Sequence, residues 1–112
     1  MHRGEIYLVD LNSHVGSEQS GIRPALIVQN EDGNTYSPTT IICPLTSKQK
    51  PTLKTHVFLT NKDCGIIRDS TVLCEQIRVI DKSRIRKKLG EITNREKIED
   101  VNRKLMISMG IE

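Results

Sequence analysis

The chain has 112 residues and a formal net charge of +3, which leaves room for one compact domain around a single hydrophobic core. Hydrophobic residues make up 36% and charged residues 28%, proportions that exclude a disordered chain. Aromatic residues amount to only 3%, with no Trp, which argues against a surface that stacks a row of nucleobases. No apolar run is long enough for a signal peptide or a membrane-spanning helix, so we expect a cytoplasmic protein with no membrane partner.

The cysteine pattern argues against a metal site. Cys43, Cys64 and Cys74 are widely spaced and include no pair with the short separation typical of structural zinc ligands. Cys43 and Cys74 lie inside apolar segments, where a free Cys behaves as a small buried hydrophobe. We therefore expect buried thiols in a reducing compartment.

Most of the chain predicts short β-strands. The segments are rich in Val, Ile, Leu, Thr and Tyr, and turn-forming clusters such as residues 31–34 separate them. Segments 24–29 and 39–45 are almost continuously apolar, which predicts central strands. The pattern indicates a mainly β domain, a coiled sheet or small barrel, with expected strands at residues 5–11, 24–29, 39–45, 56–60 and 71–80.

A basic segment and a helix follow the strands. Residues 81–88 contain five cations and one Asp, and they predict either a solvated connection or a surface for a polyanion. One helix is expected next, because Thr93 and Glu96 form a capping box and apolar residues then recur at helical spacing up to Gly110. The apolar face expected to pack on the sheet consists of Ile98, Val101, Leu105 and Met109.

Arg23 stands where a polar, glycine-containing loop enters a predicted strand, in the segment GSEQSGIRPALIVQN. Pro24 fixes its own backbone angle and biases Arg23 toward an extended conformation, so the guanidinium is held at a strand start. This placement suits a phosphate group, because the guanidinium is planar, charged and donates paired hydrogen bonds. On the residues alone, an ion pair with Glu18 or Asp10 is equally compatible.

Two further segments place polar side chains beside apolar ones. Thr46 and Ser47 end a predicted strand in CPLTSK, where a hydroxyl can face a ligand or satisfy the backbone of its own turn. Gln76 belongs to CEQIRVI, whose polar residues interrupt an apolar strand. If this segment is a regular strand, Gln76 and Arg78 lie on the opposite face to Glu75.

The segments RGEIYLVDL, GSEQSGIRPALIVQN, PLTS, THV, RDS and EQIRVIDKSRI together resemble the MazF/PemK toxins, in their usual order. The resemblance covers most of the chain and includes the C-terminal helix. It implies an SH3-like coiled sheet of the CcdB/MazF type, a homodimer, and a single endoribonuclease domain over residues 1–112. The implied activity is cleavage of single-stranded mRNA at short sequences, with no metal and no cofactor.

The resemblance also assigns roles to individual residues. Arg23 and Thr46 correspond to the catalytic pair, and RNA contacts are implied for Ser17, Glu18, Gln19, Ser47 and Gln76. In such a reaction the 2′-hydroxyl attacks phosphorus, Arg23 stabilises charge and can protonate the leaving oxygen, and Thr46 orients the reacting groups. The expected ends are 2′,3′-cyclic phosphate or 3′-phosphate and 5′-hydroxyl. The general base stays unassigned, since a guanidinium does not lose its proton near neutrality.

The expected partners follow from the same resemblance. They are single-stranded RNA, a second copy of the chain, and a cognate MazE-like antitoxin whose acidic C-terminal tail occupies the RNA groove. DNA would be bound only indirectly, through the antitoxin. A basic groove suits such a tail electrostatically.

Three alternatives are weighed against this interpretation. A CcdB-like toxin that poisons gyrase shares the fold, but this chain ends in MGIE and lacks the Trp of the Trp-Gly-Ile ending typical of those proteins. A non-catalytic RNA-binding module would use the same groove. The third alternative is catalysis by His14 and His56 as an acid–base pair. It ranks below catalysis by Arg23, because we expect His56 to pack locally.

Overall fold

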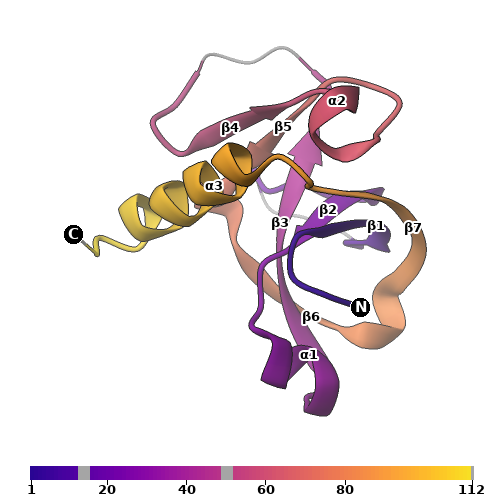
Figure 1. The fold of residues 1–112 in the computed structure, drawn as a ribbon. Helices are drawn as coiled ribbons and strands as arrows, with labels where there is room; N and C mark the ends of the chain where they lie inside the picture. The colour runs from indigo at the N-terminus through magenta and orange to yellow at the C-terminus, as the bar shows by residue number, and fades with distance from the viewer. Residues whose placement is uncertain (13–15, 49–51, 112) are drawn as a thin grey trace.

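The computed structural model describes residues 1–12, 16–48 and 52–111. These residues form a curved antiparallel sheet with one long helix at the C-terminus (Figure 1), which confirms the mainly β fold with a C-terminal helix. The strands are β1 (Glu5–Asp10), β2 (Ile22–Ile27), β3 (Thr39–Thr46), β4 (His56–Leu59), β5 (Ser70–Leu73), β6 (Arg78–Asp81) and β7 (Ile85–Glu91). The helices are α1 (Glu31–Tyr36), α2 (Asn61–Cys64) and α3 (Arg95–Ser108), with 3₁₀ turns η1 (Cys74–Gln76) and η2 (Lys82–Arg84). In this part of the chain, no helix combines the length and the apolar character needed to cross a membrane.

β3 is the central strand of the sheet. The strand order is β4-β5-β3-β2-β1-β7, and β6 pairs with β3 beside this path. One edge of β3 pairs with β2, whereas the other edge pairs first with β6 and then, at Leu45 and Thr46, with β5. The prediction that segments 24–29 and 39–45 form central strands is confirmed.

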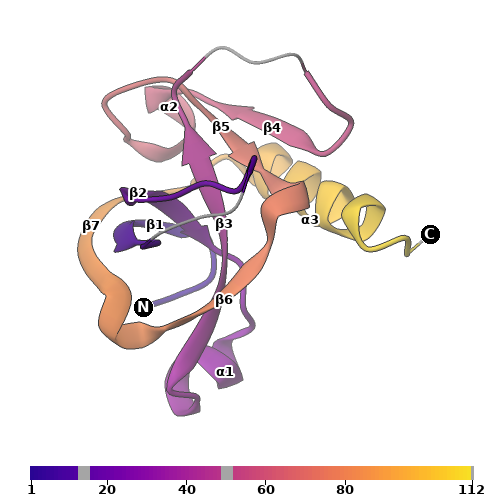
Figure 2. The same ribbon diagram turned by 180° about the vertical axis from the view of Figure 1, so that it is seen from behind.

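Side-chain alternation along the strands creates an apolar cluster on each face of the sheet. α3 covers the larger cluster through Ile98, Val101 and Leu105, as expected, whereas Met109 is 53% exposed. Figure 2 shows β6 and β7 curving round β1 and β2, and Ile80 of β6 and Ile85 of β7 pack in the smaller cluster. That cluster contains Val9, Leu11, Ala25, Ile27, Ile42 and Ile80.

The predicted strand over residues 71–80 is wrong, because the chain forms two strands joined by η1. β5 and β6 pair with successive parts of β3, but their registers differ by three residues, which is the length of η1. The 3₁₀ turn takes up these extra residues and breaks the alternation of side chains. The strand-based placement of Glu75 and Gln76 on opposite faces therefore does not apply.

The basic segment at residues 81–88 is regular structure, since it forms η2 and the first part of the edge strand β7. Exposed cations on an edge strand oppose pairing with another sheet. Lys82 Nζ donates to the Asn34 carbonyl at 2.6 Å, and Lys88 Nζ lies 2.6 Å from the Glu5 carboxylate. β7 also lies at the other end of the sheet from β4. These contacts favour a structural role for the segment.

Two expectations about helix ends are corrected. Residues 31–34 begin helix α1, which the Asn30 side chain caps, rather than forming an isolated turn. The side chain of Asn94, and not Thr93, caps α3. The Thr93 hydroxyl instead donates to the backbone carbonyl of Asp63 at 3.3 Å. Thr93 does not cap α3 because its hydroxyl is bonded to Asp63, a residue that is distant in the sequence.

Candidate active site

Arg23 is half-buried near the start of β2. Its Nε–H donates to the carbonyl oxygen of Ser20, in the loop that precedes the strand. Asp10, considered above as an ion-pair partner, lies 3.3 Å from Arg86 instead, and Glu18 is exposed. The loop backbone thus orients the guanidinium through one of its five donors, and the two Nη groups are suited to binding phosphate oxygens.

Arg23 and Thr46 lie on neighbouring strands, just beyond the paired part of the β2–β3 ladder. The paired residues are Ala25 with Pro44, Leu26 with Cys43 and Ile27 with Ile42, so each of the two positions is two residues past the last pair. Side chains of opposed residues project from the same face of an antiparallel sheet, with Cβ atoms about 4.5–5.5 Å apart. Extending the same register by two residues would set Arg23 and Thr46 on one face, which is the arrangement that the sequence predicts.

Thr46 ends β3 and is only 3% exposed, so packing fixes its side chain. Its Oγ1 accepts a hydrogen bond from the backbone N–H of Lys48 at 3.2 Å. Because this bond uses the hydroxyl as an acceptor, its hydrogen can still be donated to a phosphate oxygen. Thr46 satisfies its own turn and keeps a donor for a ligand, so the two interpretations of this hydroxyl are compatible.

Gln76 ties η1 to the loop between β1 and β2. Its Oε1 accepts a hydrogen bond from the backbone N–H of Gln19 at 2.9 Å, and its Nε2 donates to the Ser17 carbonyl at 3.3 Å. We call these two contacts the loop clamp. The next residue, Ser20, holds Arg23. The structure therefore brings Gln76, Ser17 and Gln19 together and connects them to Arg23 through the loop backbone.

Two hollows adjoin the Arg23 and Thr46 positions, and Ser47 lines both. The first has a volume of about 330 Å³ and is bounded by Arg23 and Arg68 around an apolar floor. The second has a volume of about 310 Å³ and is bounded by Thr46 and Lys48. Both hollows thus combine cationic side chains with surfaces on which part of a ligand can rest.

The sequence interpretation missed two residues that line the second hollow, Phe58 and Thr71. Phe58 is the only Phe of the chain and is 52% exposed on β4, between buried Val57 and Leu59. An outward-facing aromatic on an alternating strand is a signal that could have identified it. Thr71 carries no such signal, because threonine is ordinary in strands.

His56 has local partners, as expected. Its Nδ1 accepts a hydrogen bond from the Leu53 N–H at 3.3 Å, and its Nε2 lies 3.1 Å from the Glu75 carboxylate. The His56 side chain is only 7% exposed. His14 lies outside the described residues. The surroundings of His56 thus favour a structural role over acid–base catalysis.

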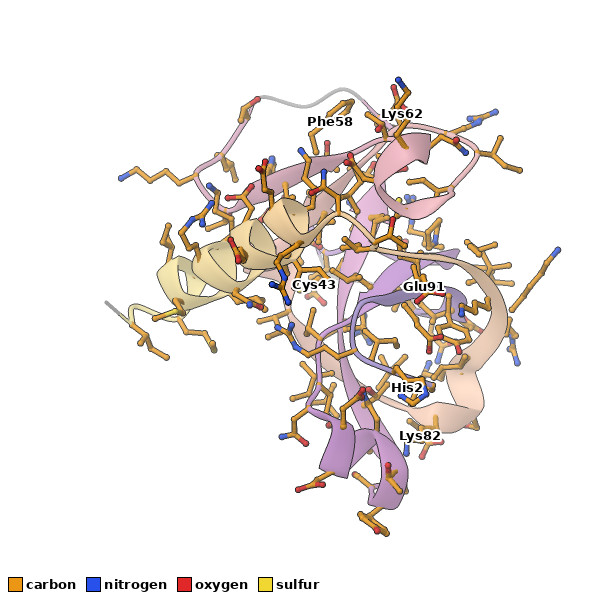
Figure 3. All side chains as sticks on the ribbon, in the orientation of Figure 1. His2, Cys43, Phe58, Lys62, Lys82 and Glu91 are labelled. Atoms are coloured by element: carbon orange, nitrogen blue, oxygen red, sulfur yellow. The ribbon has the colours of Figure 1, made fainter. Side chains whose placement is uncertain are left out.

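The three cysteines are free and buried, which confirms the expected burial of Cys43 and Cys74. Cys43 lies at the centre of the molecule beside α3 (Figure 3). Hydrogen bonding with the Cys74 thiol and burial raise the pKa of the Cys43 thiol far above its usual range, which makes it a poor nucleophile. Across residues 1–12, 16–48 and 52–111, no group of three or more His, Cys, Asp or Glu side chains is arranged to hold a metal ion.

Residues 2–109 match the profile of the PemK-like, MazF-like toxin of type II toxin-antitoxin system. The chain belongs to the PemK/MazF toxin family.

Individual relatives agree with this assignment. Endoribonuclease MazF of Staphylococcus saprophyticus subsp. saprophyticus is 43% identical over 112 residues, which cover 99% of this chain and 92% of that protein. The crystal structure of MazF from Deinococcus radiodurans superposes with a TM-score of 0.84 at 26% identity, covering 99% of this chain and 97% of that one. An endoribonuclease in complex with its cognate antitoxin, from a mycobacterial species, gives a TM-score of 0.83 at 25% identity, covering 100% and 97%.

Proposed function

We propose that this chain is an endoribonuclease that cleaves single-stranded RNA through Arg23 and Thr46. The observation that supports the proposal is that Arg23 and Thr46 lie just beyond the same end of the β2–β3 ladder, and that the buried Thr46 hydroxyl still has a hydrogen to donate. The similarity to the staphylococcal endoribonuclease supports the reaction class. Among the contacts of the described residues, none at this site specifically favours gyrase poisoning or binding without cleavage.

The proposed reaction is an internal transesterification of the RNA. The 2′-oxygen forms a bond to phosphorus, and the bond from phosphorus to the 5′-oxygen breaks, which leaves a 2′,3′-cyclic phosphate and a 5′-hydroxyl. The Nη groups of Arg23 stabilise the charge that grows on the phosphoryl oxygens, and Thr46 holds one of these oxygens. Arg23 is the proton donor that we assign to the 5′-oxygen. The acceptor of the 2′-hydroxyl proton is unassigned.

The loop and η1 supply the proposed RNA contacts, from Ser17, Glu18, Gln19, Ser47 and Gln76. One detail supports a ligand here: among the described residues, the buried Oε1 of Gln19 has no hydrogen-bond partner. A buried acceptor of this kind favours a ligand that donates, such as the amino group of a base. We therefore place the base-reading contacts at this loop and the reaction at Arg23.

A second copy of the chain is part of the proposal. Met106 and Met109 are 40% and 53% exposed on α3, and they border a hollow of about 420 Å³ that Ile41 and Ile77 also line. Stable dimers commonly bury such apolar surfaces. Light scattering should give twice the chain mass for the wild type and the single mass for Met106→Lys.

We also propose a cognate antitoxin as partner. The mycobacterial relative was solved with its own antitoxin. In this chain Arg23, Lys48 and Arg68 give the two hollows a cationic lining, which complements an acidic peptide. Such a peptide would block RNA by occupying the same surface.

Purified protein incubated with a long single-stranded RNA in EDTA tests the proposed activity. We expect discrete fragments whose new ends are 5′-hydroxyls, so that polynucleotide kinase labels them without prior phosphatase treatment. Arg23→Ala should lower cleavage by at least about 100-fold, because it removes the charge-stabilising donor, while most RNA binding is retained. Arg103→Ala, an exposed arginine on α3, is the matched control. Ends carrying 5′-phosphate, or unchanged cleavage by Arg23→Ala, would contradict the proposal.

A further inference from the structure

Three side chains form a row across the sheet beside Arg23. Thr46 on β3 is opposite Thr71 on β5, and Thr71 is opposite Phe58 on β4. Because opposed residues share a face, all three stand on one face of the sheet, and all three line the same hollow. Adjacent strands lie about 4.8 Å apart, which puts Phe58 about 10 Å from Thr46.

Phe58 is exposed although its strand is otherwise well packed. Its neighbours Val57 and Leu59 are 1% and 0% exposed, whereas Phe58 is 52% exposed. The core is thus complete without its ring, which borders hollows of about 310 Å³ and 210 Å³. In Figure 3 Phe58 projects from β4 at the upper end of the molecule. An accessible ring beside a phosphate-binding position has the properties of a stacking platform.

We propose that Phe58 stacks on one nucleobase of the RNA strand, flanking the scissile phosphate that Arg23 and Thr46 hold. The inference rests on the proposed function, because it extends the site along the same strand of RNA. It adds an affinity-determining residue to a chain whose low aromatic content allows a single base to be stacked rather than a series.

The charges around the hollow agree with this arrangement. Lys48 and Asp69 both line it. The lysine attracts the phosphate backbone, whereas the carboxylate repels phosphate and can accept a hydrogen bond from the amino group of a base. When a base lies on Phe58 and its phosphate lies at Arg23 and Thr46, Lys48 can attract the phosphate and Asp69 can accept from the base.

Steady-state cleavage of a short single-stranded RNA that contains one mapped cut site gives the first test. Phe58→Ala should lower kcat/KM by about 5- to 100-fold, almost entirely through KM, because base stacking on an aromatic contributes binding. Phe58→Trp should restore KM relative to Phe58→Ala. Tyr36→Ala is the matched control, since Tyr36 is an 84% exposed aromatic on α1, outside the row. Equal KM values for the wild type and Phe58→Ala would overturn the inference while leaving the endoribonuclease activity intact.

Fluorescence gives a readout that does not depend on cleavage. The chain contains no Trp, so Phe58→Trp in an Arg23→Ala background creates a single reporter in a protein that leaves the RNA whole. We expect saturable quenching on addition of the RNA, and no quenching for Tyr36→Trp in the same background. Absence of quenching in an RNA-bound complex would overturn the stacking. Quenching without any cleavage by the wild type would support the stacking and contradict the proposed reaction.

An abasic nucleotide placed in turn at each position flanking the cut identifies the stacked base. At one position the abasic RNA should raise KM for the wild type and not for Phe58→Ala, because the two changes remove the same contact. Additive losses at every position would contradict direct stacking.

Discussion

Asp63 of α2 accepts a hydrogen bond from Asn94, the residue that caps α3, at 2.9 Å. Its other carboxylate oxygen accepts from the backbone N–H of Thr60 at 2.9 Å and from the Thr60 hydroxyl at 3.2 Å. One side chain thus caps a short helix and fixes the start of the helix that covers the sheet. The Thr60 N–H and the Asn94 side chain lower the pKa of Asp63, because they stabilise its charged form.

Asp63→Ala should lower the free energy of unfolding by about 1–3 kcal/mol, since it removes several hydrogen bonds to a carboxylate. The lowered pKa means that this stabilisation is complete above the ordinary Asp pKa and is lost as the pH falls through the lower folded-state pKa. The difference between wild type and variant should therefore shrink below a pH of about 4. Urea unfolding at pH 7 and at stepwise lower pH checks this, with Glu99→Ala as the exposed control. A difference that stays constant down to the acid transition would contradict the assignment.

Gly90 of β7 permits close approach of α2 to the sheet. A Cβ atom built at Gly90 would lie 2.2 Å from the backbone carbonyl oxygen of Cys64. Because the obstructing atom belongs to the backbone, rotation of a side chain cannot relieve this contact. Gly90→Ala should therefore destabilise the fold by about 1–3 kcal/mol or more through backbone displacement. Chemical denaturation checks the effect, with Glu91→Ala on the same strand as control. An unchanged denaturation midpoint for Gly90→Ala would show that β7 and α2 can move apart at little cost, which would contradict this prediction.

The role of the Thr46 hydroxyl can be separated from its packing. Thr46→Val keeps the shape of this buried side chain and removes the donor, so kcat should fall by about 100-fold while RNA binding changes little. Thr46→Ser keeps the hydroxyl and should retain activity within about tenfold of the wild type. Single-turnover cleavage of a short RNA distinguishes the two variants, and thermal unfolding confirms that both are folded. Equal activity of the Ser and Val variants would remove Thr46 from the reaction.

The loop clamp predicts an effect on the loop that precedes Arg23. Gln76→Leu removes both hydrogen bonds, so the Gln19 amide should exchange faster with solvent, and kcat should fall by about tenfold as Arg23 loses its fixed orientation. Gln76→Glu keeps an acceptor for the Gln19 N–H but no donor for the Ser17 carbonyl, and should be intermediate. Hydrogen exchange and single-turnover rates measure the two effects, and Glu75→Gln in the same turn is the control. Faster cleavage by Gln76→Leu would mean that the clamp restrains the site.

Local sequence signals predicted where Arg23 and Thr46 lie in their strands but not the elements around Gln76. Pro24 and the strand boundaries put Arg23 near the start of β2 and Thr46 at the end of β3, whereas their proposed roles came from the family resemblance. The loop clamp required η1, whose position depends on how β5 and β6 share β3. This is tertiary information, because the polar residues of CEQIRVI do not by themselves show that the strand ends and a 3₁₀ turn begins.

The missed strand β7 has a different cause. Arg86, Lys87 and Lys88 are consecutive and exposed, so the strand shows no apolar alternation. Pairing with β1 forms it, and its cations suit a sheet edge. Phe58 was recognisable in principle, as a lone aromatic at an outward position, but its significance depends on the row that it makes with Thr71 and Thr46.

β3 is hydrogen-bonded to other strands along both edges, and this limits the sequence changes that such proteins can accept in it. A slip of one residue in its pairing would turn Thr46 inward and Leu45 outward, which would ruin the reaction and the core at once. A mutation that shifts β3 would therefore impair both catalysis and the packing of the core. The outward position 58 carries no comparable constraint, and in the loop at residues 16–21 the clamp bonds involve backbone groups of Ser17 and Gln19 rather than their side chains. We expect descendants of one ancestral nuclease to acquire new RNA targets at these peripheral positions while the strand that holds the hydroxyl stays the same.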